Sequence, residues 1–236
     1  MISPRRWARA SIELLDDPSA DDATVLACLG DVARINRLFG GARAALGRLD
    51  DLFRMGRAGA TLTLLDVGTG VGDIPAAAAR LARRRGLDLR LLGVERHGAA
   101  AREAQRRNGV ATCVANGCRL PLPDRSVDYV LCSQLLHHFG ADDAIRLLRE
   151  LDRVARRGVV IADLRRSALA AAGIFLVSYP LLFHPTTRRD AVISVFRGFS
   201  VAELGGLCRA AGVRPAVRRH AGFRVTAAWS PDGGRP

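Results

Sequence analysis

The first 60 residues carry apolar side chains at the spacing of amphipathic helices. Apolar positions recur at i, i+3, i+4 and i+7 from Val25 to Val32, and the same spacing resumes from Leu46 to Phe53. Between these stretches lies the pair Gly40-Gly41, which is typical of a helix break. The pattern therefore predicts an N-terminal helical segment over residues 1–60.

From Thr61 onward the pattern changes to short apolar runs that alternate with helical stretches. The runs, which we predict as strands, are Leu62–Asp66, Leu89–Glu95, Ala111–Ala115, Val127–Ser133 and Gly158–Asp163. The predicted helices between them are Asp73–Arg85, Gly98–Asn108 and Asp142–Arg156. Strands that alternate with helices pair in parallel and are covered on both faces.

The last part of the chain adds one helix and a hairpin to this pattern. Ser200 and Glu203 have the spacing of a capping box for a helix that ends near Ala211. The apolar runs Val213–Val217 and Phe223–Trp229 suit a terminal hairpin. We predict a Rossmann-like, doubly wound α/β fold with a mainly parallel seven-stranded sheet over residues 61–230, an apolar insert after the fifth strand and a polar tail at 231–236.

The strongly basic composition does not by itself indicate a function. The net charge is +13 at pH 7, and every one of the 36 residues counted as lysine or arginine is an arginine. A bias of the source genome toward arginine explains this more simply than a binding surface does. Nucleic-acid binding requires basic patches with interleaved aromatics, and aromatics make up 5% of the chain. The composition therefore disfavours a nucleic-acid partner.

Cysteines and apolar segments indicate a reduced compartment without a membrane anchor. The five cysteines form no CxxC pair and have no histidine at ligand spacing, so neither a metal site nor disulfides are expected. The N-terminus has no signal-peptide pattern. The most apolar stretch, Ala168–Phe183, is too short to span a bilayer. The expected location is the cytoplasm, and peripheral contact with lipid stays open.

The run Asp66-Val67-Gly68-Thr69-Gly70-Val71-Gly72-Asp73 joins the first predicted strand to a helix. Glycines suit such a turn because they adopt unusual dihedral angles and let a ligand approach the backbone. A dinucleotide-binding GxGxxG motif needs its third glycine at position 73, which is aspartate here, and a P-loop needs a Gly-Lys-Ser/Thr ending. A tight turn without any ligand is the alternative.

Glu95 ends the second predicted strand. An acidic residue at this point accepts hydrogen bonds from both hydroxyls of a ribose. Alone it would be read as a solvated carboxylate, but together with the glycine turn it favours a nucleoside site. The glycine turn together with Glu95 predicts an adenosine ligand rather than a phosphate.

Two further runs carry a resemblance to a known family. Residues 114–121 (VANGCRLP) and 123–130 (PDRSVDYV) resemble the third and fourth motifs of class I S-adenosylmethionine-dependent methyltransferases, in the variant found in quinone and polyketide methylation. The family usually has aspartate where Asn116 stands, which keeps an acceptor oxygen but lacks its charge. The resemblance implies S-adenosylmethionine as cofactor, and implies cofactor contacts for Asp66, Gly68, Thr69, Gly70, Gly72, Glu95, Arg96, Asn116, Gly117 and Ser133.

The segment Cys132–Phe139 is similar to the post-strand segment of natural-product methyltransferases, in which a histidine serves as general base. The resemblance implies this role for His137 or His138, with an acid, Asp163, at the end of the fifth strand. Histidine takes a phenolic proton near neutral pH, and an aspartate orients the ring. In the alternative reading the histidines are structural, and methyl transfer proceeds by proximity alone.

The acceptor is expected to be apolar. In the resembled family, segments outside the core cover the substrate, which assigns this role to residues 1–60 and to the insert Ala168–Phe199. The apolar insert fits an aromatic or lipid-like acceptor, or a homodimer interface. We predict O-methylation of an aromatic, polyketide-like or quinone-like hydroxyl. C-methylation and nucleic-acid methylation are alternatives. His184 and Asp190 are candidate substrate contacts, whereas His97 and His220 are expected on the surface.

Overall fold

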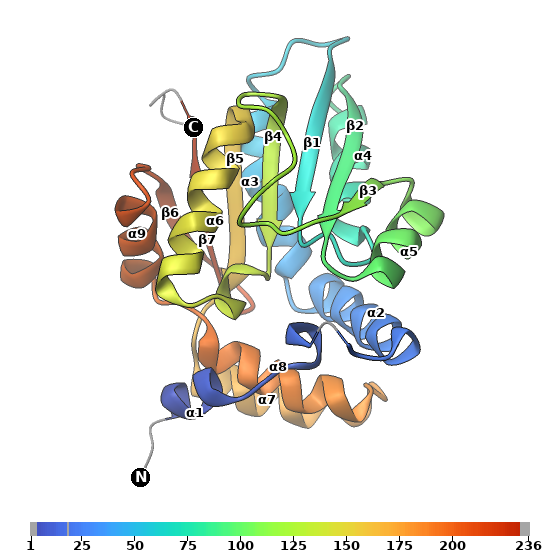
Figure 1. The fold of residues 1–236 in the computed structure, drawn as a ribbon, viewed down its shortest axis with the longest axis vertical. Helices are drawn as coiled ribbons and strands as arrows, with labels where there is room; N and C mark the ends of the chain where they lie inside the picture. Colours follow the sequence, from blue (N-terminus) through green and yellow to red (C-terminus); the bar gives the residue numbers. More distant parts are fainter. Residues whose placement is uncertain (1–3, 18, 232–236) are drawn as a thin grey trace.

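The computed structural model describes residues 4–17 and 19–231. Its centre is a single seven-stranded sheet of order β3-β2-β1-β4-β5-β7-β6, in which β7 alone runs antiparallel to its neighbours (Figure 1). The strands are β1 (Thr61–Val67), β2 (Asp88–Glu95), β3 (Ala111–Val114), β4 (Val127–Ser133), β5 (Ala155–Leu164), β6 (Ala216–His220) and β7 (Arg224–Trp229). The predicted Rossmann-like fold with a mainly parallel sheet is confirmed.

Helices cover both faces of the sheet, as the alternating pattern predicts. Along β1, Leu62 and Leu64 pack toward one face while Leu65 and Val67 pack toward the other, as the period of two in a strand requires. The first face is covered by α3 (Gly41–Phe53) and α4 (Asp73–Arg83), with α5 (Gly98–Asn108) against β2 and β3. The second is covered by α6 (Ala141–Val154) and α9 (Val201–Ala210).

The sequence prediction and the structure differ most at the junction of α6 with β5 and at β6. Helix α6 ends at Val154, and β5 begins at Ala155 because Ala155 pairs with Val127 of β4, three residues before the predicted start. Strand β6 covers residues 216–220 rather than 213–217. Val213 is instead buried in the core, and the polar residues that follow it form an edge strand that the apolar pattern alone does not reveal. The capping box of Ser200 and Glu203 is present on α9.

The remaining helices gather at the carboxyl ends of the parallel strands (Figure 1). They are α1 (Pro4–Ala10), η1 (Leu14–Asp16), α2 (Asp22–Leu38), η2 (Leu136–His138), α7 (Ala168–Ser178) and α8 (Pro185–Arg197). Among the predicted N-terminal helices only α3 packs into the sheet core, where Leu49 and Phe53 are buried. No helix in the described part of the chain has the length and apolarity needed to cross a membrane. Of the predicted polar tail, residues 232–236 lie outside the described part.

Candidate functional site

The glycine turn lies where the strand order reverses. Chain connections leave β1 toward β2 on one side and arrive at β4 on the other, and ligands of open α/β sheets bind in the crevice outside the strands at such a point. Gly68, Gly70 and Gly72 have φ angles of 76°, 54° and 78°, a region that favours glycine. The Gly68 amide donates to the Val94 carbonyl at 2.8 Å. This bond ties the turn to β2.

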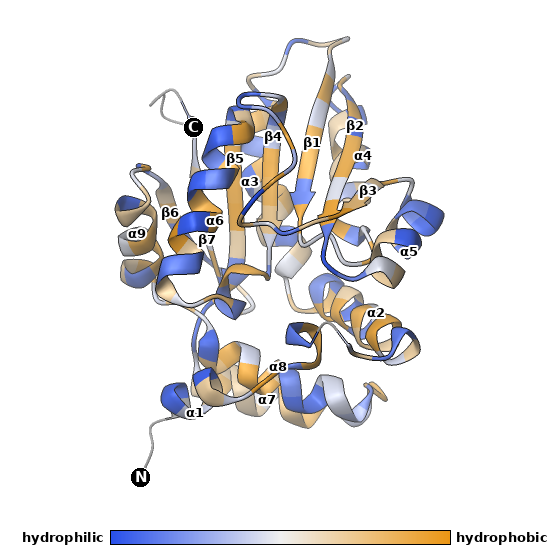
Figure 2. Cartoon of the chain, in the orientation of Figure 1, coloured by the Kyte–Doolittle hydropathy of each residue, from blue (hydrophilic) through white to orange (hydrophobic). Residues whose placement is uncertain are grey.

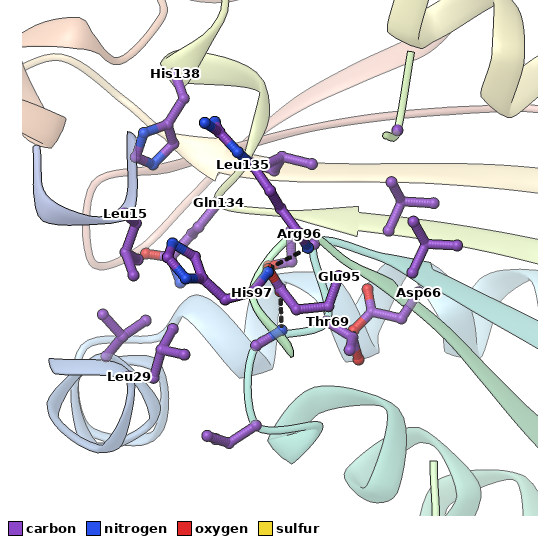
Figure 3. A pocket seen from close by; sticks show the side chains of 18 of the residues that line it. Leu15, Leu29, Asp66, Thr69, Glu95, Arg96, His97, Gln134, Leu135 and His138 are labelled. Atoms are coloured by element: carbon purple, nitrogen blue, oxygen red, sulfur yellow. Dashed lines mark hydrogen bonds between the residues drawn. The ribbon is translucent and has the colours of Figure 1, made fainter. Parts of the chain in front are cut away.

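A cavity of about 620 Å³ opens beside this turn (Figure 3). Nine of the ten predicted cofactor residues line it, namely Asp66, Gly68, Thr69, Gly70, Glu95, Arg96, Asn116, Gly117 and Ser133. Gly72 does not line the cavity. It precedes α4, and a β-carbon there would lie 2.9 Å from Val110 Cγ2, so this glycine serves the packing of the turn.

The carboxylate of Glu95 is fixed by three backbone amides. Its Oε2 accepts from the Gly70 amide at 2.8 Å, and its Oε1 accepts from the amides of Arg96 at 2.6 Å and His97 at 3.2 Å (Figure 3). A carboxylate offers about four lone-pair positions, so acceptor capacity remains for a ligand. Through the hydrogen bond from the Gly70 amide, Glu95 joins the end of β2 to the glycine turn in the wall of the cavity.

Acceptor groups line the cavity beyond β3 and β4. Asn116 Oδ1 accepts from the Cys118 amide at 2.9 Å, which leaves one of its two lone pairs. The Ser133 hydroxyl is buried and has no hydrogen-bond partner among the described residues. A buried polar group without a partner costs free energy unless a ligand or water satisfies it. These groups fit a polar ligand that donates hydrogen bonds.

Asp66 places a buried carboxyl group in the wall of the cavity. It is 3% exposed, its Oδ2 accepts from the Thr69 hydroxyl at 3.0 Å, and its Oδ1 has no partner among the described residues. Burial raises the pKa of Asp66 to about 8, a direction to which the charges of Asp73 and Glu95 add. This shift favours the protonated carboxyl near neutral pH, and a cationic ligand would favour its ionised form.

We expect Asp66 to make the empty protein less stable as pH rises from about 5 to about 8. Its pKa is higher in the folded than in the unfolded chain, so in this window the folded state binds more protons and loses stability as they dissociate. Thermal unfolding of the wild type and of Asp66→Asn should diverge by at least about 3 °C over this range. Parallel pH curves for the two proteins would contradict the assignment.

His137 and Asp163 meet at the carboxyl ends of β4 and β5. The His137 Nδ1 and Asp163 Oδ1 atoms are 2.7 Å apart, and both side chains are buried. The backbone amides of His137 and Leu164 also donate to this carboxylate. Burial would raise the pKa of Asp163, but His137 and these hydrogen bonds hold it below its usual range. A charged carboxylate only accepts, so the proton of the neutral ring lies on Nδ1 and Nε2 is left with a free lone pair.

His138 belongs to a different cluster, held by the N-terminal segment. Its Nδ1 lies 2.8 Å from Asp16 Oδ1, and its Nε2 lies 4.0 Å from Glu13 Oε2. Arg197 contacts both acids, at 3.0 Å from Glu13 and 2.9 Å from Asp16. Burial alone would lower the pKa of His138, but Asp16 and Glu13 raise it above its ordinary value. A raised pKa favours the charged form of His138, which cannot accept a proton.

A second cavity of about 410 Å³ adjoins the first, and its lining is mainly apolar. His137 lines this cavity, and its Nε2 is buried without a partner among the described residues. The two cavities share four wall residues, which are Leu15, Val32, Gln134 and His138. Helices α7 and α8 supply much of the remaining wall. The arrangement offers one compartment for a polar ligand and a neighbouring one for an apolar ligand.

Several lining residues were not predicted from the sequence. His97, expected on the surface, is 7% exposed and lines the first cavity. Gln134, in the shared wall, has a left-handed φ of 53°, which in a residue other than glycine is typical of functional sites. Arg224 is buried in the second cavity, where burial lowers its pKa to about 10 while Asp163 opposes this shift. Only the Cys132–Phe139 run gave any sequence signal, and it pointed to the histidines.

Of the two other candidate substrate contacts, Asp190 lines the second cavity and His184 does not. Asp190 lines the second cavity, where its Oδ2 accepts from the Leu14 amide at 2.7 Å. His184 instead caps α8, since its Nδ1 accepts from the Thr186 amide at 3.3 Å.

One group of side chains has the spacing of a metal site. Ligand atoms of Glu13, His137 and His138 lie within 4.8 Å of one another. The Arg197 guanidinium already neutralises Glu13 at 3.0 Å, which opposes a second cation there. That the protein needs no metal remains a prediction.

Comparison with known proteins agrees with this architecture. Residues 65–162 match the family model of a methyltransferase domain. No curated protein sequence matches the chain. The fold is similar to a SAM-dependent methyltransferase from Aquifex aeolicus, at 18% identity and a TM-score of 0.60 over 89% of this chain and 98% of that one. It is also similar to the magnesium protoporphyrin IX methyltransferase of Synechocystis PCC 6803, solved with S-adenosylhomocysteine, at 16% identity and a TM-score of 0.54 over 81% and 83%. A putative O-methyltransferase from Nostoc punctiforme gives 16% identity and a TM-score of 0.56 over 84% and 59%.

The first cavity fits S-adenosylmethionine by its own chemistry. Its unpartnered acceptors, Asp66 Oδ1 and the Ser133 hydroxyl, match a ligand that carries a cation and several donors. The glycine turn leaves the backbone open to close approach, and Glu95 retains acceptor capacity at the end of β2. Residues 65–162 match a methyltransferase domain, and the sheet order and the chemistry of this cavity agree with an enzyme that transfers a methyl group from S-adenosylmethionine.

Proposed function

We propose that the protein methylates a hydroxyl of an aromatic, polyketide-like or quinone-like small molecule, with His137 as the general base. The observation that carries this proposal is the unpartnered, buried Nε2 of His137 in an apolar cavity that adjoins the cofactor cavity. The bound cofactor supplies an electrophilic methyl group on a sulfonium. Everything else required is a pocket, an orientation and a proton acceptor, which the chain itself provides.

The dyad supports proton removal from the acceptor. Asp163 holds Nδ1 of His137 at 2.7 Å, which orients the ring and stabilises the imidazolium once Nε2 has taken the proton. A phenol has a pKa of about 10 and is mostly protonated at neutral pH, so a base increases its nucleophilicity in the transition state. His138, paired with Asp16, instead positions the N-terminal segment in the wall between the cavities.

The walls of the second cavity support an apolar acceptor. Leu14 and Leu15 of η1 and Val32 of α2 form one side, and Ile174 and Val177 of α7 form the other. These contacts support a cover made by η1, α2 and the insert, while α3 belongs to the sheet packing. An acceptor that enters between these walls is largely shielded from water, which favours a neutral aromatic or lipid-like molecule.

The acceptor class predicts a preference that can be measured. A neutral alkyl-substituted phenol should be methylated with a kcat/KM about 10- to 100-fold higher than the same phenol bearing a carboxylate, because an unpaired charge is costly in an apolar cavity. With a ¹³C-labelled methyl group, NMR of the product separates an O-methyl from a C-methyl carbon, which decides between O- and C-methylation. A preference for the carboxylate would contradict the proposal and point to Arg224 as its partner. Methylation of an oligonucleotide but of no phenol would favour the nucleic-acid alternative.

A further inference from the structure

Helix α7 is apolar along its length yet is largely uncovered in the single chain. Its sequence is ALAAAGIFLVS, and only Ala171 and Ser178 are buried. A helix that is hydrophobic all round is normally buried in a core or in a membrane. Half of the ten large exposed hydrophobic side chains among the described residues lie on α7 and the turn after it. These five, with exposures of 72%, 44%, 67%, 50% and 82%, are Leu169, Phe175, Leu176, Tyr179 and Leu182.

Most of the exposed side chains share one face of α7. Behind the helix lies the second cavity, which is the proposed acceptor cavity. Phe175, Leu176 and Tyr179 are close to one turn of a helix apart, which places them on one side of α7, while Leu169 is exposed and also borders the second cavity. On the other side Ala170, Gly173, Ile174 and Val177 line the second cavity. Figure 2 shows the hydrophobic residues of α7 at the end of the molecule where the carboxyl ends of the strands lie. A single helix therefore separates the acceptor cavity from the exterior.

Arginines border this face. Of the five arginines between residues 165 and 199, Arg166 is paired with Glu203 and Arg197 with Glu13 and Asp16, and the one acidic residue of this range, Asp190, has a side chain that is 13% exposed. The Arg188 guanidinium lies 4.4 Å from the centre of the Tyr179 ring, and the Arg189 side chain is 61% exposed. Arg34 donates to the Leu181 carbonyl at 2.8 Å, beside the turn that carries Leu182. The exposed apolar face is thus bordered by guanidinium groups.

We propose that α7 and the turn at residues 179–182 bind the surface of an anionic lipid bilayer. The apolar side chains would enter the interface between headgroups and acyl chains, where Tyr179 is well suited, while the bordering arginines pair with anionic headgroups. A second copy of the chain fits this face less well, because a two-fold contact brings like arginine borders together. The helix has 11 residues, too few to span the bilayer, so the contact is peripheral.

This contact gives the acceptor cavity a source for its ligand, a step that rests on the proposed function. A hydrophobic phenol or quinol dissolved in the bilayer would reach the cavity around α7 without crossing water. The chemical class that follows is a membrane-dissolved aromatic hydroxyl compound with an apolar tail. Membrane binding itself is measured without turnover, so the two proposals can fail separately.

The test is vesicle sedimentation of the full chain with phosphatidylcholine vesicles that contain or lack phosphatidylglycerol. Because the protein has a net charge of +13, any anionic vesicle attracts it, so binding is compared at low salt and at about 0.5 M salt, where the Debye length is ~4 Å. We expect binding to anionic vesicles to persist in part at high salt. The double variant Leu176→Asp and Leu182→Asp should lower the partition coefficient about tenfold or more.

Met55→Asp is the matched control, since Met55 is 83% exposed in the turn before β1, at the opposite end of the sheet. Compared with the single variant Leu182→Asp, at a side chain that is 82% exposed, it changes charge and exposed apolar surface in the same way, and it should bind vesicles within about twofold of the wild type whereas Leu182→Asp should bind several-fold more weakly. Equal losses in both variants would reduce the effect to net charge and overturn the proposal. A wild-type dimer in analytical ultracentrifugation that the double variant converts to a monomer, with no vesicle binding, would assign the face to a second copy. S-Adenosylhomocysteine binding by each variant verifies its fold.

Discussion

Replacing His137 by alanine is expected to lower the rate of methyl transfer about 10²- to 10⁴-fold while cofactor affinity stays close to that of the wild type. The physical reason is the position of this side chain. It lines only the acceptor cavity, its Nε2 has no partner among the described residues, and Asp163 fixes its other nitrogen. The measurement is single-turnover methylation of a neutral phenol, which separates the chemical step from product release.

Two further variants separate the base from its surroundings. Asp163→Asn removes the charge that stabilises the imidazolium and should give a smaller but clear loss of rate. His138→Ala should act mainly through the N-terminal segment, by raising KM, because His138 is bound to Asp16 of η1. His137→Gln keeps much of the buried volume and guards against a folding defect. Wild-type rates in all of these proteins would mean that catalysis is by orientation alone.

Replacing Gly70 by valine is expected to remove measurable binding of S-adenosylhomocysteine, a loss of about 100-fold or more. Gly70 has a φ of 54°, which a β-branched residue tolerates poorly, and a β-carbon there would lie 3.3 Å from Leu29 Cδ2 inside the cavity. A shifted turn would also withdraw the amide that holds Glu95 at 2.8 Å. Isothermal titration calorimetry measures the affinity, and the ligand-induced rise in melting temperature gives an independent reading.

Gly109→Val is a matched control for this substitution. Gly109 has a similar φ of 64°, but a β-carbon there meets nothing within 4 Å and the residue ends α5 outside the cavity. It should lower stability and leave cofactor affinity unchanged. Glu95→Ala should weaken binding by about 1–3 kcal/mol, and Glu95→Gln should recover part of that loss. If Gly70→Val binds like Gly109→Val, the glycine turn is structural and the cofactor lies elsewhere.

The sequence determined the sheet and the location of the candidate site. Buried parallel strands are continuous apolar runs, so the runs that end at Glu95, Ser133 and Asp163 could be read directly, and their ends had to meet at one edge. Adjacent pairing of β4 and β5 then brought Asp163 to His137, because Ser133 pairs with Ala162. The glycine turn was readable for the same reason, since its chemistry lies within a few consecutive residues.

Only the tertiary structure decided how the site is divided and closed. The contact between Asp16 and His138 joins residues 122 positions apart, and Arg197 reaches the same acids from α8. Such contacts join polar groups on surface segments, which leave no period in the sequence. The burial of His97 and the edge strand β6 were missed for a related reason, because polar residues reveal their surroundings only through their neighbours in space. The apolar insert shows the limit most clearly, since its composition predicts burial but only the fold shows which face of α7 the chain itself leaves uncovered.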